Sequence, residues 1–224
     1  MKSAVVLLSG GLDSTTALYV AKKDVGKEGK LYPLSFYYGQ RHVKELKCSE
    51  EICLGLGLDF KVVDLMDLST LVDTALTGQK EVPTEGVKEG IPITWVPQRN
   101  SIMLALAFAY AETVGADMVY TGVNVVDYSG YPDCRPDFVM AMERALNFAS
   151  KRYRETGHGI GIITPLIKKS KAQIILLGQT LKVPWELTWS CYQGREKACG
   201  SCDSCRIRRQ GFEDAGLKDP IEYE

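Results

Sequence analysis

Short apolar runs alternate with longer amphipathic or apolar segments along most of the chain. The runs are rich in valine and tyrosine, as is typical of strands buried in a sheet, and cover residues 4–8, 31–37, 60–65 and 118–121. The segments between them have the pattern of helices and cover residues 12–23, 43–56 and 101–114. This alternation predicts an α/β fold, with a parallel sheet and helices on both faces.

The third predicted helix, residues 101–114, is apolar on nearly every face. This composition predicts a helix buried within its layer. Asn100 or Ser101 is expected to cap its start, and Gly115 is expected to end it.

The first predicted strand leads into a glycine turn, Ser9-Gly10-Gly11-Leu12-Asp13-Ser14. Adjacent glycines allow the backbone to turn sharply close to a ligand, and the unpaired amides at a helix start attract an anion. The hydroxyls of Ser9, Ser14 and Thr15 add donors, whereas Asp13 repels a bare phosphate and indicates accompanying magnesium. The turn therefore predicts a site for a nucleotide triphosphate, and a glycine turn with an ordinary helix cap is the alternative.

Composition limits the functional classes. The chain has 224 residues, 45% hydrophobic and 25% charged, which suits one α/β domain with a small appendage. Its net charge of −1 gives no electrostatic basis for binding long nucleic acid. No stretch approaches the ~18 apolar residues of a membrane span. Because Met1-Lys2 precedes a core strand directly, no export signal is expected, and a cytoplasmic protein is predicted.

Four cysteines near the end of the chain have the spacing C-x7-C-x2-C-x2-C, at Cys191, Cys199, Cys202 and Cys205. Four thiolates can surround one tetrahedral ion, and Zn²⁺ is the leading candidate, with an iron–sulfur cluster as the alternative. Four protein ligands leave no position for water, which favours a structural role. We therefore expect a nucleotide-binding α/β domain over residues 1–185 and a zinc-binding segment with a C-terminal helix over residues 186–224.

Several motifs carry a resemblance to known families. The S-G-G-x-D-S turn resembles that of the ATP pyrophosphatase (PP-loop) family. The resemblance implies a Rossmann-like fold of the adenine nucleotide alpha hydrolase-like type, and a PP-loop ATP-binding domain over residues 1–185. Three polar and aromatic segments lie where loops would leave the same edge of the sheet: residues 36–42, 96–100 and 127–136. With Thr164-Pro165-Leu166, Lys171 and the cysteines, they resemble the 7-cyano-7-deazaguanine synthase family from about residue 3 to about residue 210. Tyr37 departs from the pattern, because many relatives carry an acidic residue there.

The resemblance implies an AMP-forming ligase that makes the nitrile precursor of queuosine and archaeosine. Its substrates would be 7-carboxy-7-deazaguanine, ammonia and two molecules of ATP, with Mg²⁺ and Zn²⁺ as metals. Such catalysis needs positioning and charge stabilisation rather than a protein nucleophile. The resemblance also suggests a homodimer. The chain has no spare length for a glutaminase domain, so ammonia would arrive free or from a separate partner.

The motifs supply the candidate site residues. Those expected to be catalytic are Asp13, Ser14, Arg99 and Lys171. Those expected to hold ATP are Leu8, Ser9, Gly10, Gly11, Leu12, Asp13, Ser14, Thr15, Thr16, Ala17 and Leu18. Those expected to bind the deazaguanine substrate are Tyr38, Gln40, Arg41, His42, Asp127, Tyr128, Tyr131, Asp133 and Arg135.

Each candidate residue outside the four cysteines and the glycine turn of residues 9–14 (the phosphate turn) has a structural alternative. Arg99 can be a surface residue at a helix start, and His42 a structural histidine. Lys171 lies in a basic run that is often only a solvated face. The Asp, Gly and Pro residues of 127–136 can serve the backbone of a turn alone.

Two other functions compete with the synthase. A tRNA thiolase of the same superfamily would adenylate a base and insert sulfur, and it predicts a basic face for tRNA. A zinc-ribbon module could contact nucleic acid through residues 206–209. The near-neutral charge counts against the thiolase.

Overall fold

The computed structural model describes residues 2–40, 44–72, 74–76, 90–126 and 131–224. Its centre is a five-stranded parallel sheet in the order β3-β2-β1-β4-β5. The strands are β1 (Ser3–Leu7), β2 (Lys30–Tyr37), β3 (Lys61–Asp64), β4 (Met118–Tyr120) and β5 (Gly161–Ile163). Because all five strands are parallel, their carboxyl ends meet at one edge, and the chain order reverses between β1 and β4.

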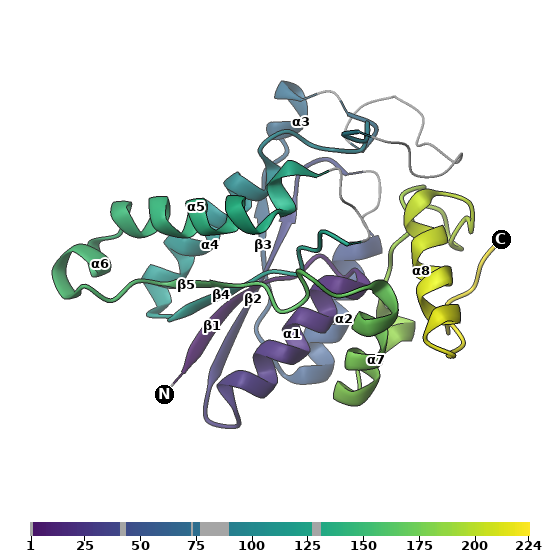
Figure 1. Ribbon diagram of the computed structural model, residues 1–224, viewed down its shortest axis with the longest axis horizontal. Coiled ribbons are helices and arrows are strands. Elements are labelled where there is room, and N and C mark those ends of the chain that lie inside the picture. Colours follow the sequence, from purple (N-terminus) through teal and green to yellow (C-terminus); the bar gives the residue numbers. More distant parts are fainter. Residues whose placement is uncertain (1, 41–43, 73, 77–89, 127–130) are drawn as a thin grey trace.

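Helices cover both faces of the sheet (Figure 1). One face carries α1 (Leu12–Val25), α2 (Lys44–Leu56) and α7 (Lys171–Leu181), and the other carries α4 (Arg99–Val114) and α5 (Pro136–Ala149). The α8 helix (Asp203–Asp214) packs on the outer side of α7. The short elements are α3 (Leu68–Leu71), α6 (Lys151–Thr156), and two 3₁₀ turns, η1 (Pro132–Cys134) and η2 (Trp185–Leu187).

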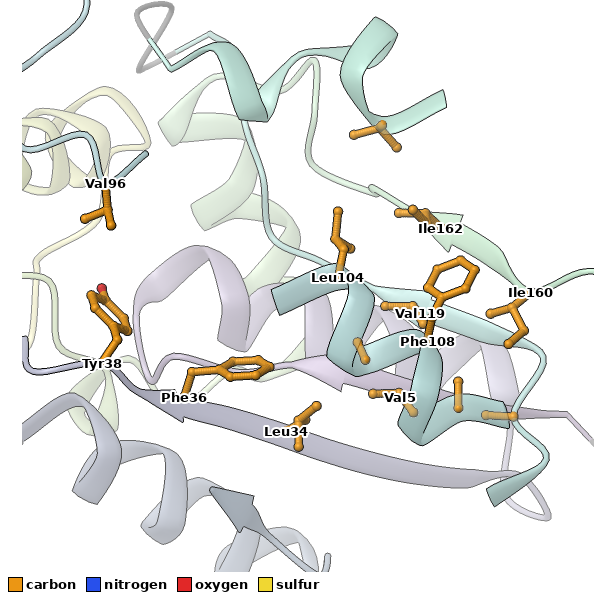
Figure 2. Close-up of a cluster of buried hydrophobic side chains, with 14 of the residues drawn as sticks. Val5, Leu34, Phe36, Tyr38, Val96, Leu104, Phe108, Val119, Ile160 and Ile162 are labelled. Carbon is orange, nitrogen blue, oxygen red and sulfur yellow. The ribbon is translucent and has the colours of Figure 1, made fainter. Parts of the chain in front are cut away.

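The central strand β1 is buried on both faces, which explains its uninterrupted apolar sequence. Val5 joins the core beneath α4 and α5, where it packs with residues such as Leu104 and Phe108 (Figure 2). Ala4 and Val6 point to the opposite face and join the core beneath α1 and α2. The alternation of side chains along one strand therefore serves two separate cores.

The predicted fold class is confirmed, and the four predicted strands and three predicted helices are present with boundaries shifted by a few residues. The prediction that the helix over residues 101–114 is buried within its layer holds for one face only. Leu104 and Phe108 are buried, whereas Ala105 and Ala109 are exposed. Alanine is apolar but small, and exposing it on a helix costs little, so its presence does not indicate a buried face.

The ends of α4 differ in how well the sequence predicted them. Gly115 ends the helix in the left-handed conformation, as expected. The start lies earlier than the expected cap at Asn100 or Ser101, because Gln98 occupies the cap position and Arg99 is already helical. Within the described part of the chain, no helix is both long enough and apolar enough to span a membrane.

Candidate functional site at the carboxyl edge of the sheet

The glycine turn joins β1 to α1 and places hydroxyl groups around its own backbone. Ser14 Oγ donates to the carbonyl of Gly11 at 3.1 Å and accepts the Ser9 amide, also at 3.1 Å. The Ser9 and Ser14 hydroxyls lie 3.0 Å apart. Among the residues that the structure describes, no side chain caps the first turn of α1. The turn is therefore ordered by its serines while the amides at the helix start remain available for an anion.

Two glycines allow the close packing around this turn. Gly10 has a φ of +81°, and a Cβ there would lie 2.1 Å from the carbonyl oxygen of Glu45. Gly122 follows β4, and a Cβ there would lie 2.8 Å from the Ser14 amide nitrogen. Any side chain at either position would displace the turn or the start of α1, so the loops after β1 and β4 depend on glycine to lie together.

Asp13 and Lys171 form an ion pair beside the turn. Lys171 Nζ lies 2.7 Å from each of the two carboxylate oxygens of Asp13. Lys171 is the first residue of α7, whose start is fixed by a capping box between Ser170 and Gln173. The lysine side chain is 12% exposed. The basic run that contains Lys171 is therefore not simply a solvated face, because its last lysine points into the site.

A cavity of about 300 Å³ opens at the carboxyl edge of the sheet. The phosphate turn forms part of its wall, and the ends of β1, β2 and β4 contribute Leu8, Phe36 and Thr121. The segment that contains the cysteines closes another part. The polar and aromatic lining residues outside the phosphate turn include Tyr38, Gln40, Glu45, Arg99, Asn100, Asn124, Tyr131, Lys171, Trp189, Ser190, Tyr192 and Arg208.

Arg99 places a positive charge in the cavity wall. Its guanidinium donates to Tyr38 Oη at 3.3 Å and lies 5.8 Å from the centre of the Tyr38 ring. Tyr131 lines the same cavity, and its hydroxyl lies 2.8 Å from Thr94 Oγ1. Tyr38 directly follows β2, Arg99 begins α4 and Tyr131 precedes η1, so the fold joins three of the sequence motifs at one place.

Two of the expected substrate contacts lie elsewhere. Asp133 accepts from Trp95 Nε1 and from the Asn100 amide, both at 3.3 Å, so its carboxylate serves the start of α4. Arg135 is exposed at the start of α5, and neither residue is part of the cavity lining. Gln40 does line the cavity, although its side chain bonds the backbone of Phe36 and Tyr38.

Some predicted residues have no described surroundings. The candidate substrate contacts Arg41, His42, Asp127 and Tyr128 lie outside the described residues. Tyr37 is the last residue of β2, stands opposite Asp64 of β3 and is not part of the cavity lining.

Sequence reasoning missed several cavity residues, of which Glu45 is the most unusual chemically. Burial raises the pKa of the Glu45 carboxyl from 4.5 to about 8, and the charge of Arg99 acts in the opposite direction. Among the described residues, Asp13 and Glu45 are the carboxylates in the cavity wall. Glu45 lies three residues beyond the F-Y-Y-G-Q-R-H motif at the start of α2, and that proximity was the available signal.

The four cysteines of the C-terminal segment converge. Their Sγ atoms all lie within 4.8 Å of one another, and those of Cys199 and Cys205 are 3.9 Å apart. Four thiolates bound tetrahedrally to one ion at ~2.3 Å would be about 3.8 Å apart. The arrangement therefore fits a single metal ion with four sulfur ligands.

A doubly wound parallel sheet with S-G-G-x-D-S at the end of its first strand defines the class of protein, a nucleotide-binding member of the PP-loop superfamily. The sequence model of the family described as "Queuosine biosynthesis protein QueC" matches residues 3–216. The chain belongs to this family.

Curated relatives support the same assignment. The chain is 52% identical to the 7-cyano-7-deazaguanine synthase of Dechloromonas aromatica, with 100% of this chain and 99% of that protein aligned. It is 50% identical to the synthase of Thermoplasma volcanium, over 99% of this chain and 91% of that protein. The synthase of Trichodesmium erythraeum is 49% identical, over 97% and 99% respectively.

Solved structures share the fold at much lower identity. NMN synthetase from Francisella tularensis has a TM-score of 0.52 at 15% identity, covering 97% of this chain and 78% of its own. The U34-tRNA thiolase NcsA from Methanococcus maripaludis, solved with its [4Fe-4S] cluster, has a TM-score of 0.50 at 17% identity, covering 100% of this chain and 74% of its own. These likenesses support the fold class alone.

Proposed function

We propose that this protein converts 7-carboxy-7-deazaguanine and ammonia to 7-cyano-7-deazaguanine at the expense of two ATP molecules. The observation that carries the proposal is near-complete alignment, at about half identity, with synthases of that name from distant organisms. The cavity supplies independent support, because it joins the phosphate turn to a half-buried arginine, Arg99, and several aromatic side chains.

The reaction balances as two adenylations. The substrate carboxylate attacks the α-phosphate of ATP, releases pyrophosphate and forms an acyl adenylate. Ammonia displaces AMP from this adenylate and loses a proton, which gives the amide. The amide oxygen then attacks a second ATP, and loss of AMP with the two N–H protons leaves the nitrile.

The phosphate turn is the proposed site for the outer phosphates of ATP. Amides at the start of α1 and the hydroxyls of Ser9 and Ser14 would donate to the phosphate oxygens. Lys171 would supply positive charge, and Asp13 holds it at the edge of the turn. Asp13 and the serine hydroxyls are hard oxygen donors of the kind Mg²⁺ prefers, and bound magnesium would neutralise charge that develops on pyrophosphate.

Arg99 is the proposed contact for the substrate carboxylate. Arg99 lines the cavity beside Tyr38 and Tyr131, whereas Arg135 is exposed outside the cavity. A guanidinium binds a carboxylate through paired donors, and it can also stabilise negative charge on the adenylate. Tyr38, Tyr131 and Tyr192 offer aromatic surface for the deazaguanine ring.

Zinc is the proposed ion of the four-cysteine site. The Sγ separations match one tetrahedral ion, whereas a cluster that gives each cysteine its own iron holds the thiolates farther apart. Four protein ligands leave no open coordination position, so the ion would stabilise residues 186–224 rather than take part in the chemistry. The division of the chain near residue 185 and the homodimer remain predictions, and sedimentation analysis would test the second.

The proposed function is tested by incubating the protein with ATP, magnesium, ammonium and 7-carboxy-7-deazaguanine. Mass detection of the amide and then the nitrile, with AMP and pyrophosphate as coproducts, is the expected result. Formation of ADP and orthophosphate, or no product from the deazaguanine acid, would refute it. A parallel incubation with tRNA and a sulfur donor tests the thiolase, because sulfur incorporation into tRNA would favour that function instead.

A further inference from the structure

A buried ion pair between α8 and the C-terminal tail lies next to the cavity but has no part in the proposed chemistry. Arg208 Nε and Nη2 donate to the two carboxylate oxygens of Asp219, at 2.8 Å and 3.0 Å. The side chains are 2% and 8% exposed. Removing two charges from water to this extent is costly unless the surrounding polar groups are satisfied.

The remaining donors of Arg208 hold the segment that enters the cysteine site. Nη1 lies 2.8 Å from Thr188 Oγ1, 3.3 Å from the Thr188 carbonyl and 3.4 Å from Ser190 Oγ. Nη2 also donates to the carbonyl of Trp185 at 3.1 Å. A single guanidinium therefore fixes residues 185–190 to the C-terminal tail.

Residues 188–190 in turn contact the phosphate turn. The Trp189 amide donates to the Gly10 carbonyl at 2.9 Å. A Cβ at Gly11 would lie 3.5 Å from the Trp189 carbonyl, so the two backbones run close together. On the other side, Gly10 lies against the carbonyl of Glu45. The phosphate turn is thus confined between α2 and the segment that Arg208 holds.

We infer that Arg208 and Asp219 are positioning residues for the phosphate turn. The pair fixes residues 188–190, the Trp189 amide fixes the Gly10 carbonyl, and the orientation of that peptide sets where the following amides point. Neither side chain needs to touch ATP. The kinetic part of this inference rests on the proposed function, whereas its structural part does not.

Three variants test the inference. Asp219→Asn keeps the shape of the side chain but removes its charge. Thr188→Val removes the hydroxyl that Arg208 contacts and leaves the ion pair intact. Asp214→Asn is the matched control, because Asp214 is an exposed carboxylate of α8 that accepts only a surface contact from Gln210 among the described residues. Circular dichroism and thermal melting establish that each variant folds.

Hydrogen exchange of residues 9–16 in the ligand-free protein is the first readout. We expect the amides there to exchange about tenfold faster in Asp219→Asn and Thr188→Val than in wild type or Asp214→Asn. Exchange at the wild-type rate in either folded variant would overturn the inference. This readout stands even if the wild-type protein makes no nitrile, in which case the proposed function alone fails.

The second readout compares the KM for ATP with the KM for the deazaguanine acid in each variant. We expect KM for ATP to rise about tenfold in Asp219→Asn, while KM for the deazaguanine acid stays near wild type. General loss of folded protein would lower the apparent kcat without moving either constant. An unchanged KM for ATP, or an equal rise in both constants, would contradict a role at the phosphate turn.

Discussion

The ion pair between Asp13 and Lys171 makes a specific prediction at the residue scale. Lys171→Met keeps the aliphatic stem and removes the charge, so we expect kcat to fall by about 10²-fold or more, since no group replaces that charge beside the phosphates. Asp13→Asn should cause a similar loss, because the amide cannot hold the lysine as both carboxylate oxygens do. Steady-state kinetics with saturating substrates measures both effects.

Lys168→Met is the matched control for this prediction. Lys168 lies in the same basic run but is exposed and begins no helix. Its variant should turn over at the wild-type rate. Equal losses in Lys168→Met and Lys171→Met would show that only the general charge of the run matters.

The Glu45 carboxyl predicts a pH-dependent stability. Burial raises its pKa from 4.5 to about 8 in the folded protein. The unfolded chain therefore releases this proton earlier, and the contribution of Glu45 to stability falls as pH rises from about 4.5 to about 8. Glu45→Gln stays neutral throughout, so we expect its melting temperature to gain on wild type as pH rises through that range.

Thermal melts at several pH values, with Glu50→Gln as the control, check this prediction. Glu50 lies on the same helix but is exposed. A constant difference in melting temperature between Glu45→Gln and wild type across the range would contradict the raised pKa.

Some candidate site residues could be predicted from the sequence and others could not. The phosphate turn and the cysteine spacing could be located because their chemistry requires those residues at those intervals. For the D-Y-S-G-Y-P-D-C-R segment, the sequence does not show which side chains face the site, because a turn has no regular period that separates inward from outward positions. The structure places Tyr131 in the cavity wall, Asp133 against α4 and Arg135 at an exposed position at the start of α5.

At the element scale, the close contact between α7 and α8 predicts that a side chain at Gly211 of α8 destabilises the protein. A Cβ at Gly211 would lie 2.3 Å from Lys171 Cγ and 2.8 Å from Lys171 Cβ. Gly211→Ala should therefore push the two helices apart, cost about 1–3 kcal/mol of unfolding free energy and displace Lys171 from Asp13. Denaturant unfolding and kcat measure the two consequences.

Gly55→Ala provides the control at this scale. Gly55 lies within α2 and is exposed, and a Cβ there meets no atom within 4 Å. The helix preference for alanine should raise the unfolding free energy by about 0.5–1 kcal/mol without changing kcat. Similar effects from both substitutions would mean that the α7–α8 contact is not tight.

Of the elements that the sequence analysis did not predict, β5 and α3 are short, whereas α5 has 14 residues and an apolar face that recurs with helical spacing at Phe138, Met142 and Leu146. Strand β5 has three residues, the first of them glycine, so it carries little strand signal. Helix α7 did carry a signal, the capping box formed by Ser170 and Gln173. The run of lysines around the start of α7 suggested a solvated face instead. Lys171 points inward because it forms an ion pair with Asp13, which lies far from it in the sequence.

At the scale of the whole molecule, the C-terminal tail and the cysteine segment support each other. A backbone bridge pairs Ala198 with Tyr223, and the Tyr223 hydroxyl donates to Asp219 at 2.6 Å. Ile221 and Tyr223 pack against the cluster that contains the four cysteines. The same segment contacts the phosphate turn through the Trp189 amide, which donates to the Gly10 carbonyl. We therefore expect the order of the cysteine segment to affect the order of the phosphate turn.

This link predicts how metal removal will act. Stripping the ion with a strong chelator should raise hydrogen exchange across residues 186–224, because four thiols without an ion lose the tie that joins their loops. It should also weaken ATP binding, since the Trp189 contact with Gly10 depends on that segment. Restoring zinc should reverse both changes. Exchange that rises at the cysteines while ATP affinity stays constant would show that the phosphate turn keeps its shape without the segment, and the proposed link would then be wrong.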